Sequence, residues 1–208
     1  MAMTPDALAA VAEWSWLEGR RRALGGFWTF VRGRSVEQAM AAFGADPATA
    51  RAMTLDGSAD EFAGREDGRR RVLPWARFGG YGAWTFVLED MTDLGMRAVA
   101  ALSAGTQAAY VSWTPKVTYE VAFYEHGRCV TAFEPMMEWS LRGDEPERFA
   151  QQMRALGIMP RPDDWRTGAY PNGLVHMLAF LTLVAGVRIP EEVAHGPLLT
   201  CALPHDTA

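Results

Sequence analysis

The chain has 208 residues and a net charge of −5 at pH 7, a length that suits one domain or one domain with a small appendage. Because no long basic run is present, duplex nucleic acid is not an expected partner. The most apolar stretch, Leu174–Val184, has eleven residues and contains His176, whereas a membrane-spanning helix needs about 20 apolar residues. We therefore expect neither a nucleic-acid nor a membrane partner.

Location and redox state follow from the N-terminus and the cysteines. The first residues lack the basic region and apolar core of a signal peptide, so the sequence predicts a soluble, cytoplasmic protein. Cys129 and Cys201 are far apart, and two free thiols are expected in a reducing cytosol, with one disulfide as the alternative. No His or Cys has metal-site spacing to another, so no metal ion or other cofactor is predicted.

The first predicted element is a helix that begins at Thr4, a good N-cap residue followed by proline and an acid. Leu8, Val11, Trp14 and Leu17 are spaced to line one side of it. The glycine pair at 25–26 is expected to end this element.

A repeated tetrapeptide, Trp-Thr-Phe-Val, occupies Trp28–Val31 and Trp84–Val87. Each copy leads into an amphipathic stretch, Ser35–Phe43 or Met96–Leu102, and then into a second apolar run. Strand, helix and strand within about thirty residues is the length of a β-α-β unit. An internal β-α-β repeat would make the sheet mixed. Both faces of the first strand, Phe27–Val31, are apolar, which predicts a central strand covered on both sides.

The middle of the chain contains a predicted loop and a weak strand. Residues 56–71 hold three glycines and mixed charges, which is typical of a surface loop. Val72–Phe78 is interrupted by Pro74, so we expect it at a sheet edge, where it could pair with a copy of itself.

A hairpin is predicted around His126-Gly127, with Val117–Glu125 and Arg128–Glu134 as its strands, after another strand at Thr106–Trp113. The expected cross-strand pairs are Glu125 with Arg128, Phe123 with Val130, Val121 with Ala132, and Tyr119 with Glu134.

The C-terminal part holds two predicted helices and a last strand. Phe149, Met153 and Leu156 form the inner stripe of the first helix. Leu174–Ala185 is apolar almost all round, which indicates a helix buried between layers. The last strand is Leu198–Leu203.

The sum is an α+β fold with a single mixed, mostly antiparallel sheet of about six to eight strands, packed by about four or five helices. We expect one domain over residues 1–208, in which residues 144–203 pack on a core formed by residues 14–135.

Several strings together resemble a family. They are Trp14-Ser-Trp16-Leu17-Glu18, Thr29-Phe-Val-Arg-Gly33, Ser35-Val-Glu-Gln, Phe43-Gly-Ala-Asp46, Trp84-Thr-Phe-Val-Leu-Glu89, Leu102-Ser-Ala-Gly-Thr106 and Thr131-Ala-Phe-Glu-Pro135. They resemble a domain of unknown function common in high-GC bacteria, over roughly residues 14–135 together with the final helix and Gly196-Pro197-Leu-Leu. The resemblance implies a coherent fold and carries no established activity.

Tryptophans are the first candidate binding residues. Trp16, Trp84 and Trp113 could line a pocket for a flat or apolar ligand or anchor a partner protein. The alternative is core packing, which strand phasing favours for Trp28 and Trp84.

Carboxylates are the second candidates. Glu89, Glu120 and Glu134 lie in strands or at strand ends, and Glu18 ends the first helix. A glutamate beside Tyr119 on an apolar face would have a raised pKa and could accept a proton. No second motif defines such a site, and pairing with Arg32, Arg97 or Arg128 is the simpler interpretation.

No catalytic signature is present, so no residue is assigned a catalytic role, and a non-catalytic binding or interaction protein is the first hypothesis. Its partner would be another bacterial protein, as for accessory or immunity-type proteins. The alternative is a small-molecule-binding protein or enzyme with a pocket of Trp16, Trp84 and Trp113 and with Glu89 or Glu134 as its polar element. A third hypothesis is an oligomeric scaffold built through Val72–Phe78.

Overall fold

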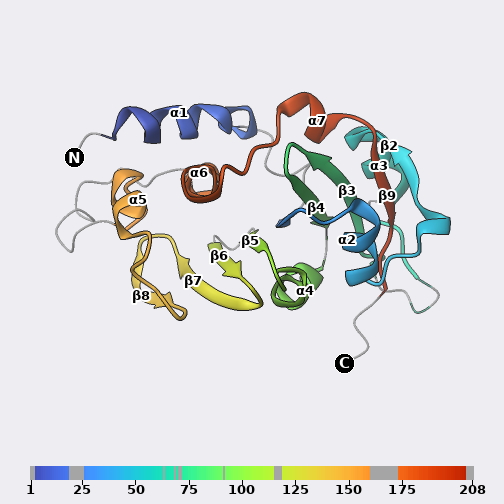
Figure 1. Cartoon of the computed structure of the whole chain (residues 1–208). Helices are drawn as coiled ribbons and strands as arrows, with labels where there is room; N and C mark the ends of the chain where they lie inside the picture. Colours follow the sequence, from blue (N-terminus) through green and yellow to red (C-terminus); the bar gives the residue numbers. More distant parts are fainter. Residues whose placement is uncertain are drawn as a thin grey trace.

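The computed structural model describes residues 3–18, 26–62, 64–67, 69, 72–90, 92–114, 119–159 and 173–204. Over these residues the chain forms one nine-stranded sheet with seven α-helices (Figure 1). The helices are α1 (Pro5–Glu13), α2 (Val36–Ala42), α3 (Leu55–Phe62), α4 (Leu94–Leu102), α5 (Ala150–Ala155), α6 (Gly173–Ala185) and α7 (Glu191–His195), and the 3-10 helices are η1 (Ser15–Leu17) and η2 (Pro47–Thr49). The strands are β1 (Phe27–Arg32), β2 (Arg51–Met53), β3 (Trp75–Tyr81), β4 (Trp84–Asp90), β5 (Gln107–Trp113), β6 (Tyr119–Glu125), β7 (Arg128–Glu134), β8 (Met137–Arg142) and β9 (Leu198–Ala202).

The strand order is β2-β9-β3-β4-β1-β5-β6-β7-β8, and every neighbouring pair is antiparallel. The α+β class is confirmed, and β1 is central as predicted. The strand and helix counts exceed the expected ranges. The strand missing from the sequence-based prediction is β8, which follows β7 after a two-residue turn at Pro135-Met136.

The two repeat units have different places in the sheet. Both β4 and β5 are antiparallel to β1, so they run in the same direction on its two sides and are joined by α4. β1 and β2 also run in the same direction, but β4, β3 and β9 lie between them. Because no parallel strands are neighbours, the sheet is antiparallel and not mixed.

The layer above the sheet in Figure 1 is built on α6, and we call this side of the sheet the α6 face. Alternate residues such as Trp28, Phe30 and Phe86 point from the sheet into this core and are fully buried. α1 packs on the outer side of α6, where Trp14 Nε1–H donates to Thr182 Oγ1 over 2.8 Å. α6 is therefore covered on both sides, as its uniformly apolar sequence predicts.

The opposite side, the α4 face, carries a second core beneath α2 and α4. Val31 and Val87 point into this core from the two central strands. Ser35 and Gln38 form a capping box at the start of α2, which lies within the predicted amphipathic stretch Ser35–Phe43. This completes a helix–sheet–helix arrangement around the central strands.

Three local predictions are wrong. Leu8 is 51% exposed and lies outside the buried stripe of α1. Residues 55–62 form α3 instead of a loop, because Leu55, Ser58 and Phe62 share a buried face and Phe62 stacks on Trp75 at 5.7 Å.

The proposed edge strand Val72–Phe78 is the third wrong prediction. β3 begins at Trp75, after Pro74, so the proline costs the ladder no hydrogen bond. β3 lies inside the sheet, between β4 and β9, and its edge is not available for self-pairing.

The hairpin is present with a shifted register. Glu125 pairs with Arg128 as predicted, but an irregularity between Phe123 and Tyr124 moves the later pairs by one residue. Val121 then lies opposite Phe133, and Phe123 opposite Thr131. The extra residue is Val130 in β7, and Val130 and Phe133 both pack in the α6-face core although they are three positions apart.

Both cysteines are free, as expected. None of the helices in the described ranges is long and apolar enough to cross a membrane. Gly25, the first residue of the glycine pair that was expected to end the first helix, lies outside the described residues.

Candidate functional site

Glu89 is a fully buried carboxyl group at the end of β4, on the α4 face. The backbone N–H of Gly95 lies 3.1 and 3.2 Å from its two carboxyl oxygens. Asp93, at the N-cap of α4, makes no side-chain capping bond. Glu89 therefore performs the capping role for α4 from a neighbouring strand.

The surroundings of Glu89 favour its neutral form. Burial raises the pKa of Glu89 to about 8, although the backbone N–H groups of Gly95 and Leu94 favour the charged form. At neutral pH the carboxyl group of Glu89 is therefore mostly protonated and uncharged.

Hydroxyl and aromatic side chains surround this carboxyl group on the same face. In the register of β1, Thr29 lies opposite Tyr110, while Phe27 lies opposite both Ser112 and Glu89. The ring of Phe27 stacks on Tyr110 at 6.4 Å. Burial raises the pKa of the Tyr110 phenol, which has Ser112 as a hydrogen-bonding neighbour.

Thr29 Oγ1 is buried and has no hydrogen-bond partner among the described residues. A Cβ atom on Gly95 would lie 2.0 Å from this oxygen and 2.4 Å from Glu89 Oε1. α4 thus approaches the sheet closely over both polar groups, and only glycine leaves room for them.

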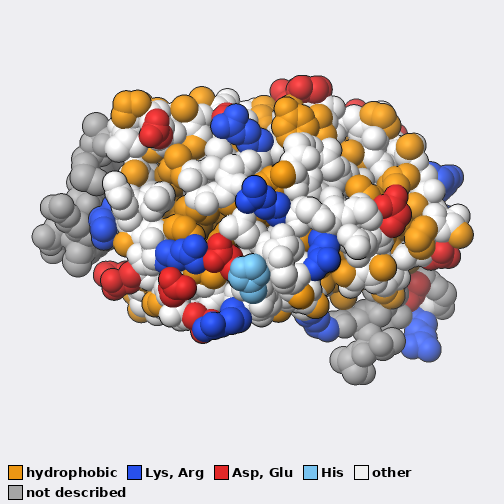
Figure 2. Space-filling view, in the orientation of Figure 1, with side chains coloured by type: hydrophobic (Ala, Val, Ile, Leu, Met, Phe, Trp, Pro, Cys, Tyr) orange, Lys and Arg blue, Asp and Glu red, His pale blue; other side chains and the backbone are white. Residues whose placement is uncertain are grey.

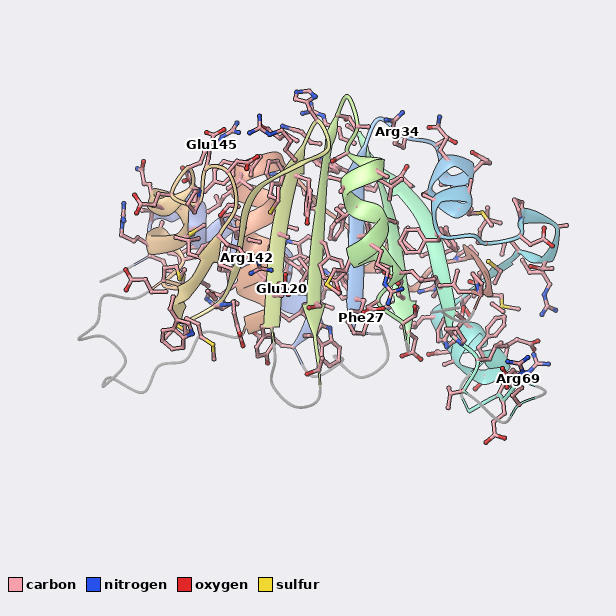
Figure 3. The ribbon with its side chains drawn as sticks, turned by 90° about the horizontal axis from the view of Figure 1, so that it is seen from below. Phe27, Arg34, Arg69, Glu120, Arg142 and Glu145 are labelled. Carbon is pink, nitrogen blue, oxygen red and sulfur yellow. The ribbon has the colours of Figure 1, made fainter. Side chains whose placement is uncertain are left out.

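Glu89, Ser112 and Glu120 form a row of polar side chains that continues into the part of the α4 face that no described helix covers. Ser112 pairs with Glu120 across β5 and β6, and the Arg142 guanidinium on β8 donates to Glu120 Oε1. Figure 3 shows Glu120 and Arg142 beside each other on strands that no described helix covers on this side. The row therefore runs from a buried acid to a solvent-exposed ion pair.

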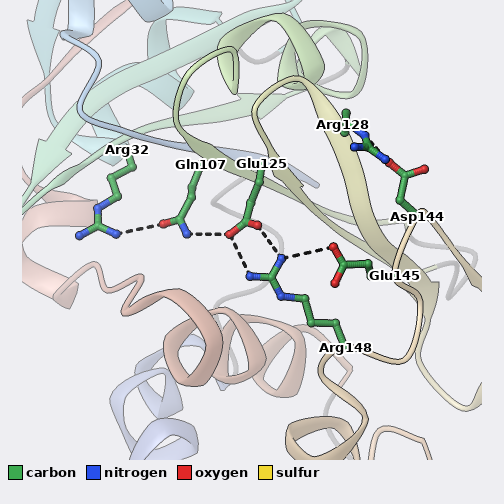
Figure 4. A network of polar contacts seen from close by, with 7 residues as sticks. All are labelled: Arg32, Gln107, Glu125, Arg128, Asp144, Glu145 and Arg148. Carbon is green, nitrogen blue, oxygen red and sulfur yellow. Dashed lines mark hydrogen bonds and ion pairs between the residues drawn. The ribbon is translucent and has the colours of Figure 1, made fainter.

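A second polar group lies at one end of the strands (Figure 4). Arg32 donates to Gln107 over 3.0 Å, Gln107 to Glu125 over 2.9 Å, and Arg148 to Glu125 over 2.5 Å. Arg148 also lies 3.9 Å from Glu145. Basic and acidic side chains are interspersed on the face shown in Figure 2, so this face has no large region of one charge sign. The network links strand ends through pairs of opposite charge.

Two of the family-like strings meet near this network. Thr106 Oγ1 donates to the carbonyl oxygen of Arg32, and Arg34 donates to the carbonyl oxygens of Leu102 and Ala104. These hydrogen bonds connect the end of β1 and the loop after it to the loop before β5.

The outer edge of β8 is the third notable feature. Trp139 is 82% exposed there, and no described strand pairs with this side of β8. The other exposed large apolar side chains, such as Leu8 at 51%, are less accessible. An exposed indole on an open strand is typical of a surface that binds another protein.

The sequence-predicted pocket residues are divided between the two faces of the sheet. Trp84, Trp113 and Tyr119 pack in the α6-face core, with Trp16 at 5.4 Å from the ring of His195. Glu89 points to the opposite face from Trp84, since it lies five positions further along β4 and successive side chains alternate between the faces. Trp113 and Tyr119 are brought together as a cross-strand pair.

The remaining two predicted residues lie apart from both groups. Glu18 is exposed at the end of η1. Glu134 ends β7, half-buried, and its backbone N–H donates to Ser140 Oγ over 2.8 Å. Over the ranges that the structure describes, no group of three or more His, Cys, Asp or Glu side chains could hold a metal ion.

Sequence reasoning missed Thr29, Tyr110 and Trp139. Thr29 and Tyr110 were predictable, because the alternation of their strands puts their polar groups on a face that is otherwise apolar. The signal for Trp139 was the alternation of Met137–Arg142 directly after a proline turn.

The chain matches a family model, but this match carries no activity. No curated protein matches it. No solved structure matches it. A family model described as a family of unknown function matches residues 7–207, which is nearly the whole chain. The chain therefore belongs to this family, DUF6461.

Proposed function

We propose that this chain is a non-catalytic binding protein that docks another protein along the exposed edge of β8. The observation that carries the proposal is the 82% exposure of Trp139 on a strand with a free outer edge. Tryptophan is enriched among residues that dominate binding energy, and a free edge offers main-chain hydrogen bonds to an extended segment.

The finer parts of the proposal come from the resemblance and from the sequence. They are a bacterial, high-GC origin, a cytoplasmic location and an accessory or immunity-type role.

The test is affinity capture with the purified chain, comparing the wild type with Trp139→Ser. We expect a stoichiometric protein partner with the wild type and loss of that partner with Trp139→Ser. The matched control is Leu8→Ser, which removes another exposed apolar side chain, on α1. Capture that does not depend on Trp139 contradicts the proposal.

A small-molecule-binding protein or enzyme is the second candidate, and Glu89 and Thr29 favour it. A buried acid with a raised pKa beside an unbonded hydroxyl group is an arrangement found at functional sites. Thermal-shift screening tests this candidate, because a ligand at 100 times its Kd adds about 2.7 kcal/mol of stability. A ligand whose shift disappears in Thr29→Val supports it, and the absence of any shift across a broad metabolite library removes it.

A further inference from the structure

We infer that residues 94–97, the first turn of α4, form a flap that opens away from the sheet when the Glu89 carboxyl group loses its proton. The helix would turn about its C-terminal end, which stays attached. This flap lies on the α4 face, and its action does not depend on the docking surface at β8. The two ends of α4 are attached unequally, and polar groups are buried beneath the flap.

The C-terminal end of α4 is held by apolar packing and by hydrogen bonds. Val99 and Leu102 are both buried in the core of the α4 face. Arg34, in the loop after β1, donates to the carbonyl oxygen of Leu102. The backbone N–H of Gly127, in the turn between β6 and β7, donates to Ser103 Oγ over 3.0 Å. This end is therefore a fixed point about which the helix can turn.

The N-terminal end of α4 is attached less firmly. Its buried residue is Gly95, which has no side chain to pack, while Leu94 is half-buried and Met96 is 42% exposed. Asp93 makes no side-chain capping bond, so the carboxyl group of Glu89 accepts the backbone N–H of Gly95 from β4. Glu89 is therefore the polar contact that fastens this turn to the sheet.

Two buried polar groups beneath the flap favour its opening. Thr29 Oγ1 has no hydrogen-bond partner among the described residues, and a buried hydroxyl group without a partner carries a desolvation cost. The Glu89 carboxyl group lies beside it under Gly95. Opening admits water to both groups, which offsets part of the packing that is lost.

The surroundings of Glu89 make the closed flap unfavourable for a carboxylate. Burial raises the pKa of Glu89, and the nearby Asp93 raises it further, while Arg97 lies 4.0 Å from Asp93. On the same face, burial raises the pKa of Tyr110 on β5 and of Cys201 on β9, so both are neutral at pH 7. The residues opposite Glu89 on β1 and β3 are uncharged, and α2 buries apolar side chains. Among the described residues, no cation therefore compensates an ionised Glu89.

The raised pKa sets the direction of the switch. The closed form holds the Glu89 proton with a pKa of about 8, whereas the solvated carboxyl group of the open form has the ordinary value of 4.5. The closed form is most favoured below pH 4.5. The equilibrium constant for opening should then rise about tenfold per pH unit between about pH 5 and pH 7 and level off above pH 8. The open form presents a carboxylate and a hydroxyl group beside the uncovered strands of the α4 face.

The test is hydrogen exchange of single backbone amides, measured by NMR between pH 5.5 and pH 8 and corrected for the intrinsic exchange rate at each pH. For Gly95 and Met96 the opening constant should rise about tenfold per pH unit up to pH 7. Their amides should also be less protected than that of Ser103, which donates to the carbonyl oxygen of Val99 at the attached end.

Glu89→Gln cannot ionise and should remove the rise. The matched control is Asp93→Asn, which neutralises a 41% exposed carboxylate in the same segment and should keep the rise. Low concentrations of urea separate the flap from global unfolding, because opening one turn exposes little surface. This measurement on the wild type decides between them even if Glu89→Gln does not fold.

Three results would each overturn the flap. They are an opening constant that does not change with pH in the wild type, a rise that persists in Glu89→Gln, and exchange of Gly95 and Met96 with the opening free energy and urea dependence of the amides of β1. None of them bears on the docking surface, which is read from Trp139-dependent capture of a different protein.

Discussion

The two halves of the sheet treat charge differently. Around β3, β4 and β1, helices pack on both faces, and two ionisable side chains, Arg77 and Glu89, are buried. Around β6, β7 and β8, described helices cover only one face, and pairs such as Glu120 with Arg142 remain in solvent. Substitutions in the first half should therefore act on folding, and those in the second half on binding of a protein partner.

Arg77 shows how the covered half accommodates a charge. It is 1% exposed and donates to the carbonyl oxygens of Ala194 and Gly196 over 2.5 and 2.7 Å, and to that of Met53 over 3.3 Å. Burial lowers its pKa to about 10, which still leaves it charged at neutral pH. It thereby joins the end of α7 and strand β2 to the middle of the sheet.

The largest expected effect is the pH dependence that Glu89 imposes on stability. Its pKa is 4.5 in an unfolded chain and about 8 when folded, so the folded state holds the proton more tightly. The stabilisation is fully present below pH 4.5 and is lost as pH rises toward 8, by about 5 kcal/mol in total. Glu89→Gln should remove this loss. Urea unfolding between pH 5 and pH 9 measures it, and parallel profiles for the two proteins would contradict a buried, protonated Glu89.

Arg77→Met should lower the free energy of unfolding by about 3 kcal/mol or more, because it leaves buried carbonyl groups without a hydrogen-bond donor. The matched change on the neighbouring surface is Arg51→Met, which breaks only an exposed pair with Glu61 and should cost less than about 1 kcal/mol. Denaturant unfolding compares the two variants. Equal effects would mean that burial does not distinguish the two arginines.

Gly95→Ala should destabilise the fold by about 2 kcal/mol, because the new methyl group would overlap Thr29 Oγ1 and Glu89 Oε1. Gly57→Ala in α3 is the control. Its methyl group meets only Thr54 Oγ1, at 3.2 Å, so the gain in helix propensity offsets the contact. A Gly95→Ala protein that unfolds at the wild-type denaturant concentration would show that α4 can shift away from the sheet.

The smallest effect on folding should come from Trp139→Ser in the open half. Since the side chain is 82% exposed, the free energy of unfolding should change by less than about 0.5 kcal/mol. Binding of a protein partner should nevertheless be lost, which affinity capture with the same sample measures. A large loss of stability would place Trp139 in the fold instead of on a binding surface.

The sequence predicted the parts of the fold that depend on local patterns. β1 and β4 were evident from alternating apolar residues on both faces, α6 from its apolar circumference, and the start of α2 from its capping box. The hairpin register was missed because the prediction assumed regular alternation through both strands, whereas a bulge in β7 adds one residue between Cys129 and Thr131. β3 was misplaced because a proline just before a strand resembles one within it.

The candidate site was harder to predict than the fold. Glu89 was identified as a candidate, but its capping of α4 depends on a contact between two elements whose relative position the sequence does not state. Its separation from Trp84 follows from strand alternation and was accessible from the sequence. The proximity of Arg142 to Glu120 depends on β7 and β8 adding in order to β6, which requires the whole topology.

The position of β9 has a consequence for synthesis of the chain on the ribosome. β9, the strand of this sheet that lies latest in the sequence, inserts between β2 and β3, and Thr200 pairs with both Arg51 and Arg77. Until residues 198–202 have left the exit tunnel, β2 has no partner strand and β3 has one unpaired side. We therefore expect the sheet to close only after β9 has been synthesised, and chains truncated before Leu198 to be prone to aggregation.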